Sequence, residues 1–229
     1  MRQRLFADRD RLHTGLMLAL TFSTGVVDAV GYLGLDRVFT GNMTGNVVIL
    51  GMALTGAEGL PVVGPVVALA CFLVGATLAG RALRHRPAGW STRTTALLTA
   101  VAVLLVATAV VAIAVPTPRP EALAYSVTGA LGLSMGMQAG AARQIGVKDV
   151  TTVVVTSTIV GLAFDSTLGR GGGQPWFRRA AAIVLIGLGA LCGAALLRLG
   201  IGPGIALAAL VVVAVAVIGH IEAHRIHPR

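Results

Sequence analysis

Charged residues are scarce in this chain, and their scarcity excludes a water-soluble surface. They make up 12% of the 229 residues, whereas 55% are hydrophobic, and a soluble domain carries about 25% charged residues. Aromatic residues are also few, at 4%, and they are not interleaved with basic residues as in a nucleic-acid platform. We therefore predict no nucleic-acid partner. The net charge of +9 is better explained by basic loops on the cytoplasmic side of a membrane.

Clusters of cysteine and histidine are missing as well. The two cysteines, Cys71 and Cys192, both fall in apolar stretches without neighbouring histidines. We therefore expect no disulfide and no metal site, and we predict no cofactor. A cleaved signal peptide is not expected, because Asp8 and Asp10 interrupt the basic N-terminus and no A-x-A cleavage site follows the first apolar segment. The first apolar segment is predicted to stay as a membrane helix.

Apolar segments of two lengths organise the chain and predict an all-α polytopic membrane protein, with one transmembrane domain over residues 1–229. Six segments are long, at about 13–35, 61–80, 94–115, 121–142, 179–197 and 203–219, and two are short, at 40–55 and 151–165. The apolar part of a short segment, roughly 10 residues or 15 Å of helix, covers about half of the hydrocarbon core. The short segments are therefore candidates for helices that do not cross.

The basic residues distinguish between two topologies. If the short segments do not cross and the N-terminus is cytoplasmic, fifteen of the 18 Lys and Arg residues lie inside, and only Arg37, Arg119 and Arg198 lie outside. If both short segments cross, the split becomes ten to eight. The positive-inside rule therefore favours six spans, both termini in the cytoplasm, and two re-entrant or half-spanning helices. Eight spans are the alternative.

An internal repeat emerges when the chain is shifted by 112 residues. The aligned pairs include Thr40 with Thr152, Thr44 with Thr156, Gly45 with Ser157, Asn46 with Thr158, and the charged pair Asp36–Arg37 with Lys148–Asp149. With repeats at about 13–115 and 121–220, each half would cross three times and the halves would have opposite orientations. This is the inverted-repeat plan of many secondary transporters. Chance is the alternative, since sequences made of few residue types align easily with themselves.

An acid lies in the middle of the first long segment. Asp28 follows Ser23 and Thr24 by about one helical turn. A carboxylate at such depth is costly unless it is paired, hydrated or protonated. Asp28 is therefore a candidate to carry a proton or bind a cation. The structural alternative is a neutral acid that locks the helix break through hydrogen bonds to Asn42 or Asn46.

A polar loop separates the first long segment from the first short one. Thr40, Asn42, Thr44 and Asn46 alternate with other residues there, and the helix that follows would point its N-terminal N–H groups into the protein, as at an anion-binding helix end. A plain N-cap, expected at Asn46, is the alternative. The counterparts in the second half are Thr152, Thr156 and Ser157, whose hydroxyls could instead bond only to their own helix.

The fourth long segment carries both polar and small residues. Gln138 is predicted to face the interior, and Arg143 to reach the cytoplasmic interface. Gly132, Gly136 and Gly140 form one smooth face for close helix packing, which is a candidate seam for a homodimer. The same stretch reads G-x-S-x-G around Ser134, but that signature needs a strand–turn–helix elbow and a histidine. We therefore predict no enzymatic activity. Asp165, after the second short segment, is expected at the surface.

The stretch GVVDAVGYL at 25–33, followed by FTGNMTGN at 39–46, resembles the YoaK-type family of uncharacterised bacterial inner-membrane proteins. The recognisable residues lie between Gly25 and Leu54. The resemblance implies a multi-pass inner-membrane protein of about this size. It implies no substrate, catalytic residue or cofactor.

A small-solute transporter or channel of unknown substrate is the function that we infer from these patterns. Its expected partners are the lipid bilayer, an unknown small solute and a second copy of the chain. A non-transporting membrane scaffold or partner subunit is the alternative, and an intramembrane enzyme is less favoured. The predicted pathway residues are Asp28, Ser23, Thr24, Thr40, Asn42, Thr44, Asn46, Gln138, Thr152, Thr156 and Ser157.

Overall fold

The computed structural model describes residues 2–57, 59–115, 120–147, 155–171 and 176–226, and every regular element in these ranges is helical. The elements are α1 (Arg2–Gly34), α2 (Met43–Ala53), α3 (Val63–Ala82), α4 (Thr92–Ala114), α5 (Glu121–Ile145), α6 (Val155–Phe164), α7 (Trp176–Leu196), the 3-10 turn η1 (Leu197–Leu199) and α8 (Ile201–Ile226). The predicted all-α fold is confirmed, and α2 and α6 are the two short helices.

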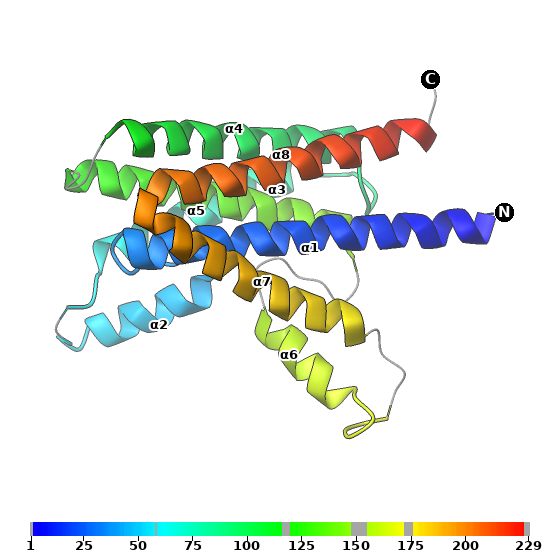
Figure 1. Ribbon diagram of the computed structural model, residues 1–229, viewed down its shortest axis with the longest axis horizontal. Helices are drawn as coiled ribbons and strands as arrows, with labels where there is room; N and C mark the ends of the chain where they lie inside the picture. Colours follow the sequence, from blue (N-terminus) through cyan, green and yellow to red (C-terminus); the bar gives the residue numbers. More distant parts are fainter. Residues whose placement is uncertain (1, 58, 116–119, 148–154, 172–175, 227–229) are drawn as a thin grey trace.

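The long helices form a bundle in which consecutive members alternate in direction. They run along the long axis of the molecule, α7 obliquely, and both chain termini lie at the same end (Figure 1). The short helix α2 lies toward the opposite end, and α6 lies toward the end that holds the termini (Figure 1). Three close pairs build the bundle: α3 with α5, α1 with α7, and α4 with α8.

Five of the long helices are long and apolar enough to cross a bilayer. These stretches are 10–34, 63–82, 92–114, 176–199 and 201–223. The helix α5 has 25 residues but a less apolar sequence, and it packs against α1, α3 and α4 with twelve of its residues buried. Three polar side chains of α5, those of Thr128, Ser134 and Gln138, are thus covered by protein instead of lipid. The sixth span stays a prediction.

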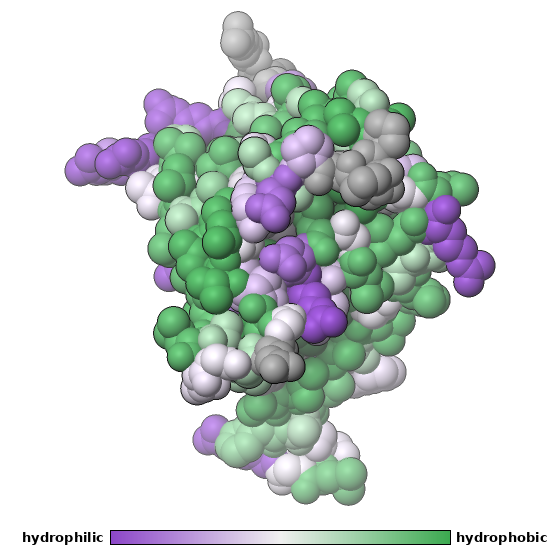
Figure 2. Space-filling model, turned by 90° about the vertical axis from the view of Figure 1, so that its left-hand side faces the viewer, coloured by the Kyte–Doolittle hydropathy of each residue, from purple (hydrophilic) through white to green (hydrophobic). Residues whose placement is uncertain are grey.

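The outside of the bundle is apolar, as a membrane protein requires. Large exposed hydrophobic side chains lie on α4, α7 and α8, among them Val103, Val110, Leu191, Leu210 and Val217. Figure 2 shows the end opposite the termini, where hydrophobic residues cover the sides and hydrophilic residues gather toward the middle of the face. The distribution matches contact with lipid around the sides and with water at the end.

Glycines allow the backbones of two helix pairs to touch. A Cβ atom added at any of four glycines would overlap a carbonyl oxygen of the facing helix. Between α3 and α5, Gly75 meets Leu133 and Gly136 meets Phe72. Between α1 and α7, Gly25 meets Ile186 and Gly189 meets Phe22. Such direct backbone contact is the packing that small residues permit in membrane helices.

The predicted homodimer seam is therefore wrong in its location. Gly132 and Gly136 face the carbonyl groups of Ala68 and Phe72, and Gly140 faces the side chain of Ala79. This face of α5 is filled by α3 of the same chain, so it is not open to a second copy. The sequence indicates a smooth helix face but does not say which helix covers it.

Candidate functional site

The helix break after α1 is held by the carboxylate of Asp28. This side chain is 9% exposed, and its Oδ1 accepts hydrogen bonds from three consecutive backbone N–H groups, those of Thr40 at 2.9 Å, Gly41 at 2.6 Å and Asn42 at 3.4 Å. Backbone N–H groups of an irregular loop need such an acceptor at membrane depth. The predicted bonds from Asp28 to the side chains of Asn42 or Asn46 are replaced by bonds to backbone.

A second polar side chain closes the loop on itself. Asn46 is buried; its Nδ2 donates to the Phe39 carbonyl at 2.5 Å, and its Oδ1 accepts from the Phe39 N–H at 2.9 Å. The ring of Phe39 stacks on Tyr32 of α1, with centroids 4.8 Å apart. The side-chain amide of Asn46 thus pairs with both backbone groups of Phe39. This pairing holds the loop in place and is a structural role.

The first turn of α2 leaves polar groups free. The Asn42 side chain caps it by accepting from the Gly45 N–H at 3.2 Å, so the plain N-cap falls on Asn42. Thr44 is exposed, and neither its hydroxyl nor its N–H has a hydrogen-bond partner within the described ranges. The free groups at this helix end are therefore those of Thr44.

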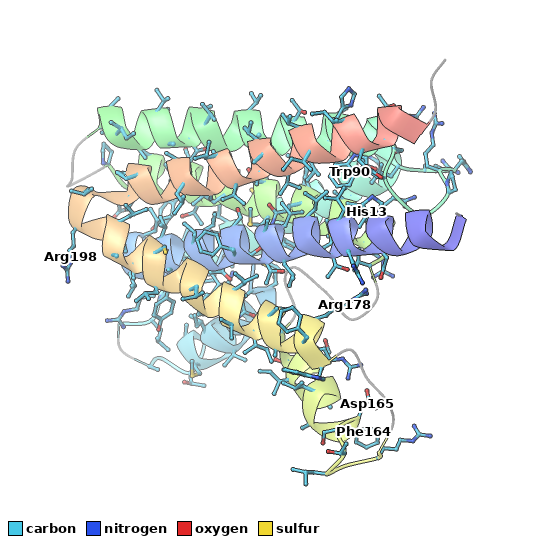
Figure 3. All side chains as sticks on the ribbon, turned by 45° about the vertical axis from the view of Figure 1, so that its right-hand side comes forward. His13, Trp90, Phe164, Asp165, Arg178 and Arg198 are labelled. Atoms are coloured by element: carbon cyan, nitrogen blue, oxygen red, sulfur yellow. The ribbon has the colours of Figure 1, made fainter. Side chains whose placement is uncertain are left out.

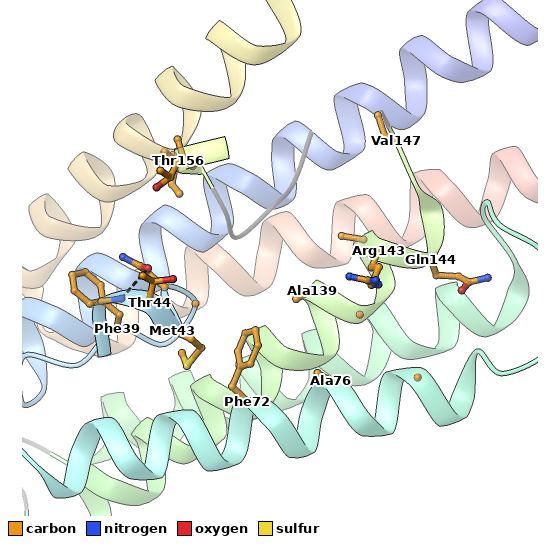
Figure 4. A pocket seen from close by; sticks show the side chains of 18 of the residues that line it. Phe39, Met43, Thr44, Phe72, Ala76, Ala139, Arg143, Gln144, Val147 and Thr156 are labelled. Atoms are coloured by element: carbon orange, nitrogen blue, oxygen red, sulfur yellow. Dashed lines mark hydrogen bonds between the residues drawn. The ribbon is translucent and has the colours of Figure 1, made fainter. Parts of the chain in front are cut away.

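One cavity joins the two short helices. It has a volume of about 1250 Å³ and an open mouth, and Figure 4 shows the residues around it. The N-terminal ends of α2 and α6 both contribute, through Met43 and Thr44 and through Val155 and Thr156. The remaining lining comes from the loop and α1, from α3 and α5, and from α7, including Tyr32, Phe39, Gly41, Asn42, Phe72, Ala76, Ala139, Gly140, Arg143, Gln144 and Ile186. The two short helices therefore extend from one hollow toward opposite ends of the bundle.

Comparisons with known proteins bear on the whole chain. Residues 16–218 match the family model described as "Protein of unknown function (DUF1275)". The chain belongs to the DUF1275 family. It is also 29% identical to the UPF0700 transmembrane protein YoaK of Bacillus subtilis (strain 168) over 188 residues, which cover 77% of this chain and 80% of that protein. No solved structure matches the chain. The predicted resemblance is confirmed, and this DUF1275 chain is a multi-pass helical transmembrane protein.

Three of the predicted pathway residues lie in the helical core of this DUF1275 chain. Ser23 donates to the Ala208 carbonyl of α8 at 3.4 Å, and Thr24 donates to the Leu20 carbonyl of its own helix at 3.0 Å. The amide of Gln138 donates to the Thr24 hydroxyl at 3.0 Å. As predicted, Gln138 faces the interior. None of the three is among the residues that line the cavity.

The second half contributes fewer described groups. Thr156 lines the cavity, whereas Ser157 is exposed elsewhere on α6. Thr158 is the buried residue of α6, in the place that Asn46 takes in α2. Thr152 and the Lys148–Asp149 pair lie outside the described residues.

The structure also tests two expectations for α5 and α6, the surface position of Asp165 and the helical state of the G-x-S-x-G stretch. Asp165 is 36% exposed in its side chain but forms an ion pair with Arg179 at 2.8 Å, and Arg179 also donates to the Gly161 carbonyl at 2.5 Å. These bonds tie α6 to α7, near the end of the bundle where Figure 3 places Asp165. Ser134 donates to the Ala130 carbonyl within α5, so the G-x-S-x-G stretch is helix and not an elbow.

The cavity contains residues that the sequence analysis missed. Arg143, predicted to reach the interface, lines the cavity together with Gln144 and Tyr32. No local pattern distinguishes Arg143 from the other arginines near helix ends. Its place depends on how α5 packs beside α3 and across the cavity from the short helices, which is information that only the tertiary structure supplies.

Proposed function

We propose that this chain moves a small solute across the bacterial inner membrane through the cavity between α2 and α6. In this proposal six helices span the bilayer with both termini in the cytoplasm, and α2 and α6 are re-entrant. The observation that carries the proposal is the shared cavity: the irregular backbone before α2 and the start of α6 meet in one hollow inside an apolar bundle. Irregular backbone at membrane depth is tolerated where it is buried in protein or lines a water-filled space.

An inverted repeat is part of the same proposal, and the helix pairing supports it. If α1, α2, α3 and α4 are exchanged with α5, α6, α7 and α8, every pair of packed α-helices found within the described ranges maps onto another such pair or onto itself. The pair α3–α5 becomes α7–α1, α4–α8 is unchanged, and α2–α3 becomes α6–α7. Opposite directions of α1 and α5 in Figure 1 agree with an inverted relation.

The glycine contacts support the repeat at the level of single residues. A shift of 111 residues carries Phe22 to Leu133 and Gly25 to Gly136, and a shift of 114 carries Phe72 to Ile186 and Gly75 to Gly189. Under these two shifts the contact of Gly136 with the Phe72 carbonyl becomes that of Gly25 with the Ile186 carbonyl, and the contact of Gly75 with Leu133 becomes that of Gly189 with Phe22. The four matched backbone contacts support the proposed repeat over a chance alignment of apolar sequence.

Cysteine chemistry tests whether α2 and α6 line one solute path. In a chain with Cys71 and Cys192 replaced by alanine, we expect Thr44→Cys and Thr156→Cys to react with a membrane-impermeant thiosulfonate reagent. Val110→Cys, which is 59% exposed on the lipid-facing side of α4, is the control and should stay unreactive.

Uptake by proteoliposomes supplies the second readout. A screen of small solutes of negative, zero and positive charge should find at least one that enters, and the bulky reagent attached at Thr44→Cys or Thr156→Cys should slow its entry severalfold. Entry that is unaffected at both positions, or the absence of uptake for all solutes, would reject the transport proposal. In that case the scaffold function becomes the better hypothesis, and a stable co-purifying partner is its expected sign. Chemical crosslinking in detergent tests the proposed homodimer.

A further inference from the structure

One described charge lies in the cavity. Among the lining residues that the structure describes, Arg143 is the charged one, and none of them is a carboxylate. Arg143 is exposed toward this space, and it has no ion pair or hydrogen bond within the part of the chain that the structure describes. A guanidinium group presents five N–H donors in a fixed fork, so the cavity holds several donors without an acceptor.

Other arginines use their guanidinium groups inside the protein. Arg179 pairs with Asp165, Arg178 pairs with Asp10, and Arg37 and Arg93 donate to backbone carbonyls. Other exposed arginines, such as Arg81 and Arg198, also have no such bond among the described residues, so what distinguishes Arg143 is its place in the cavity.

The carboxylate that holds the loop does not line the cavity. Asp28 is buried behind Gly41, outside the lining, and its Oδ1 already accepts three backbone N–H groups. On the α2 side the cavity presents the Thr44 hydroxyl and N–H, which are also without partners within the described ranges. Both groups can donate hydrogen bonds. The free side-chain groups of the described lining thus include the Arg143 guanidinium, which only donates, and the Thr44 hydroxyl, which can donate.

We propose that the cavity binds a small oxyanion, a carboxylate or a phosphate, through Arg143. This inference rests on the proposed transport function and gives the class of its solute. Arginine binds both groups through two parallel N–H···O bonds, which lysine does not reproduce. The Thr44 groups of α2 supply further donors from the other side of the space.

Selective flux tests the proposal with the full-length chain in vesicles of zwitterionic phosphatidylcholine. The probes are inorganic phosphate and acetate as anions, glycerol as a neutral solute, and choline as a cation. We expect the anions to enter fastest, Arg143→Gln to slow anion entry roughly tenfold, as the loss of a charge-assisted hydrogen bond implies, and Arg143→Lys to keep part of the rate. Arg198→Gln is the matched control, because Arg198 is exposed at the far end of the bundle (Figure 3) and should leave the rate unchanged.

The outcomes separate this inference from the transport proposal. Entry of glycerol or choline in preference to anions, or equal anion entry in Arg143→Gln and the unsubstituted chain, would overturn the anion site and leave transport standing. If no probe enters, the transport proposal fails and this inference fails with it.

Chemical modification gives a test that needs no variant. In the unsubstituted chain, inorganic phosphate should slow the reaction of Arg143 with phenylglyoxal at least severalfold and leave that of Arg198 unchanged, as measured by peptide mass spectrometry. Equal rates with and without phosphate would overturn the proposal. A lipid headgroup is the other source of a phosphate: protection by phosphatidylglycerol in the vesicles but not by free phosphate would assign the site to lipid and overturn the solute proposal.

Discussion

Gly25 and Gly136 occupy matched places in the two closest helix pairs, and replacing either by alanine should weaken the bundle. The added Cβ atom would overlap a backbone carbonyl oxygen, that of Ile186 or of Phe72. A backbone atom cannot rotate away as a side chain can, so the helices must separate by roughly 1 Å to restore van der Waals contact, and atoms along the pair lose attraction. Overpacking of this kind costs about 1–3 kcal/mol, occasionally more, against a gain of about 1 kcal/mol in helix propensity.

Two other glycines provide the controls. A Cβ atom at Gly80 of α3 or Gly187 of α7 would meet nothing within 4 Å. Alanine at these positions should therefore leave the free energy of unfolding unchanged or raise it by up to about 1 kcal/mol. Since test and control share the gain in helix propensity, each test variant should lie roughly 1–3 kcal/mol below its control.

Unfolding in mixed micelles of increasing SDS content, followed by tryptophan fluorescence, measures the difference. If Gly25→Ala were as stable as Gly187→Ala, the reasoning from backbone contact would be refuted. The free energies of unfolding of Gly25→Ala and Gly136→Ala should be similar. If they differed by as much as either differs from its control, the equivalence of the two helix pairs would be refuted instead.

Three further predictions concern the short helices. Asp28→Asn replaces charge-assisted bonds to the loop by neutral ones and should lower the free energy of unfolding by about 1–3 kcal/mol in the same titration. Asp28→Ala should lower it further. Equal stability of the two variants and the unsubstituted chain would contradict the anchoring role of Asp28. Asn46→Ala removes both bonds to Phe39, so limited proteolysis should cut residues 35–42 faster, and an unchanged rate would show that the loop holds without them. Arg179→Gln breaks the bonds from α7 to Asp165 and Gly161, so amide hydrogen exchange should speed up over 155–164 and not over 43–53. The same change of exchange rate in both helices would argue against this tie.

The long and short helices could be predicted because hydrophobic length determines them directly. The break near Asp28 was predicted for the same reason, since amide and hydroxyl side chains interrupt an apolar run there. The partners of these polar groups could not be predicted. Asp28 bonds to three backbone N–H groups, and whether a carboxylate meets side chains or backbone depends on how the loop from Thr40 to Asn42 folds back.

The helix that packs on each helix face could also not be predicted from the sequence. Gly132, Gly136 and Gly140 predict a close contact equally well with a second copy and with α3, and the structure places α3 there. Arg143 and Arg179 have similar positions near helix ends, yet one lines the cavity and the other pairs with Asp165. Sequence spacing gives a residue its helix face, whereas the neighbour on that face depends on how the whole bundle packs.

The direct backbone contact between α3 and α5 has a consequence for how the hollow beside them can change shape. Gly75 and Gly136 bring a backbone carbonyl of the opposite helix against their own backbone with no layer of side chains between the two helices, so the contact itself has no side chains whose rearrangement could let α3 and α5 slide apart. The short helices are built differently, since α2 and α6 each pack on few neighbours. We therefore expect the cavity to widen through displacement of α2 or α6, while α3 and α5 stay packed against each other.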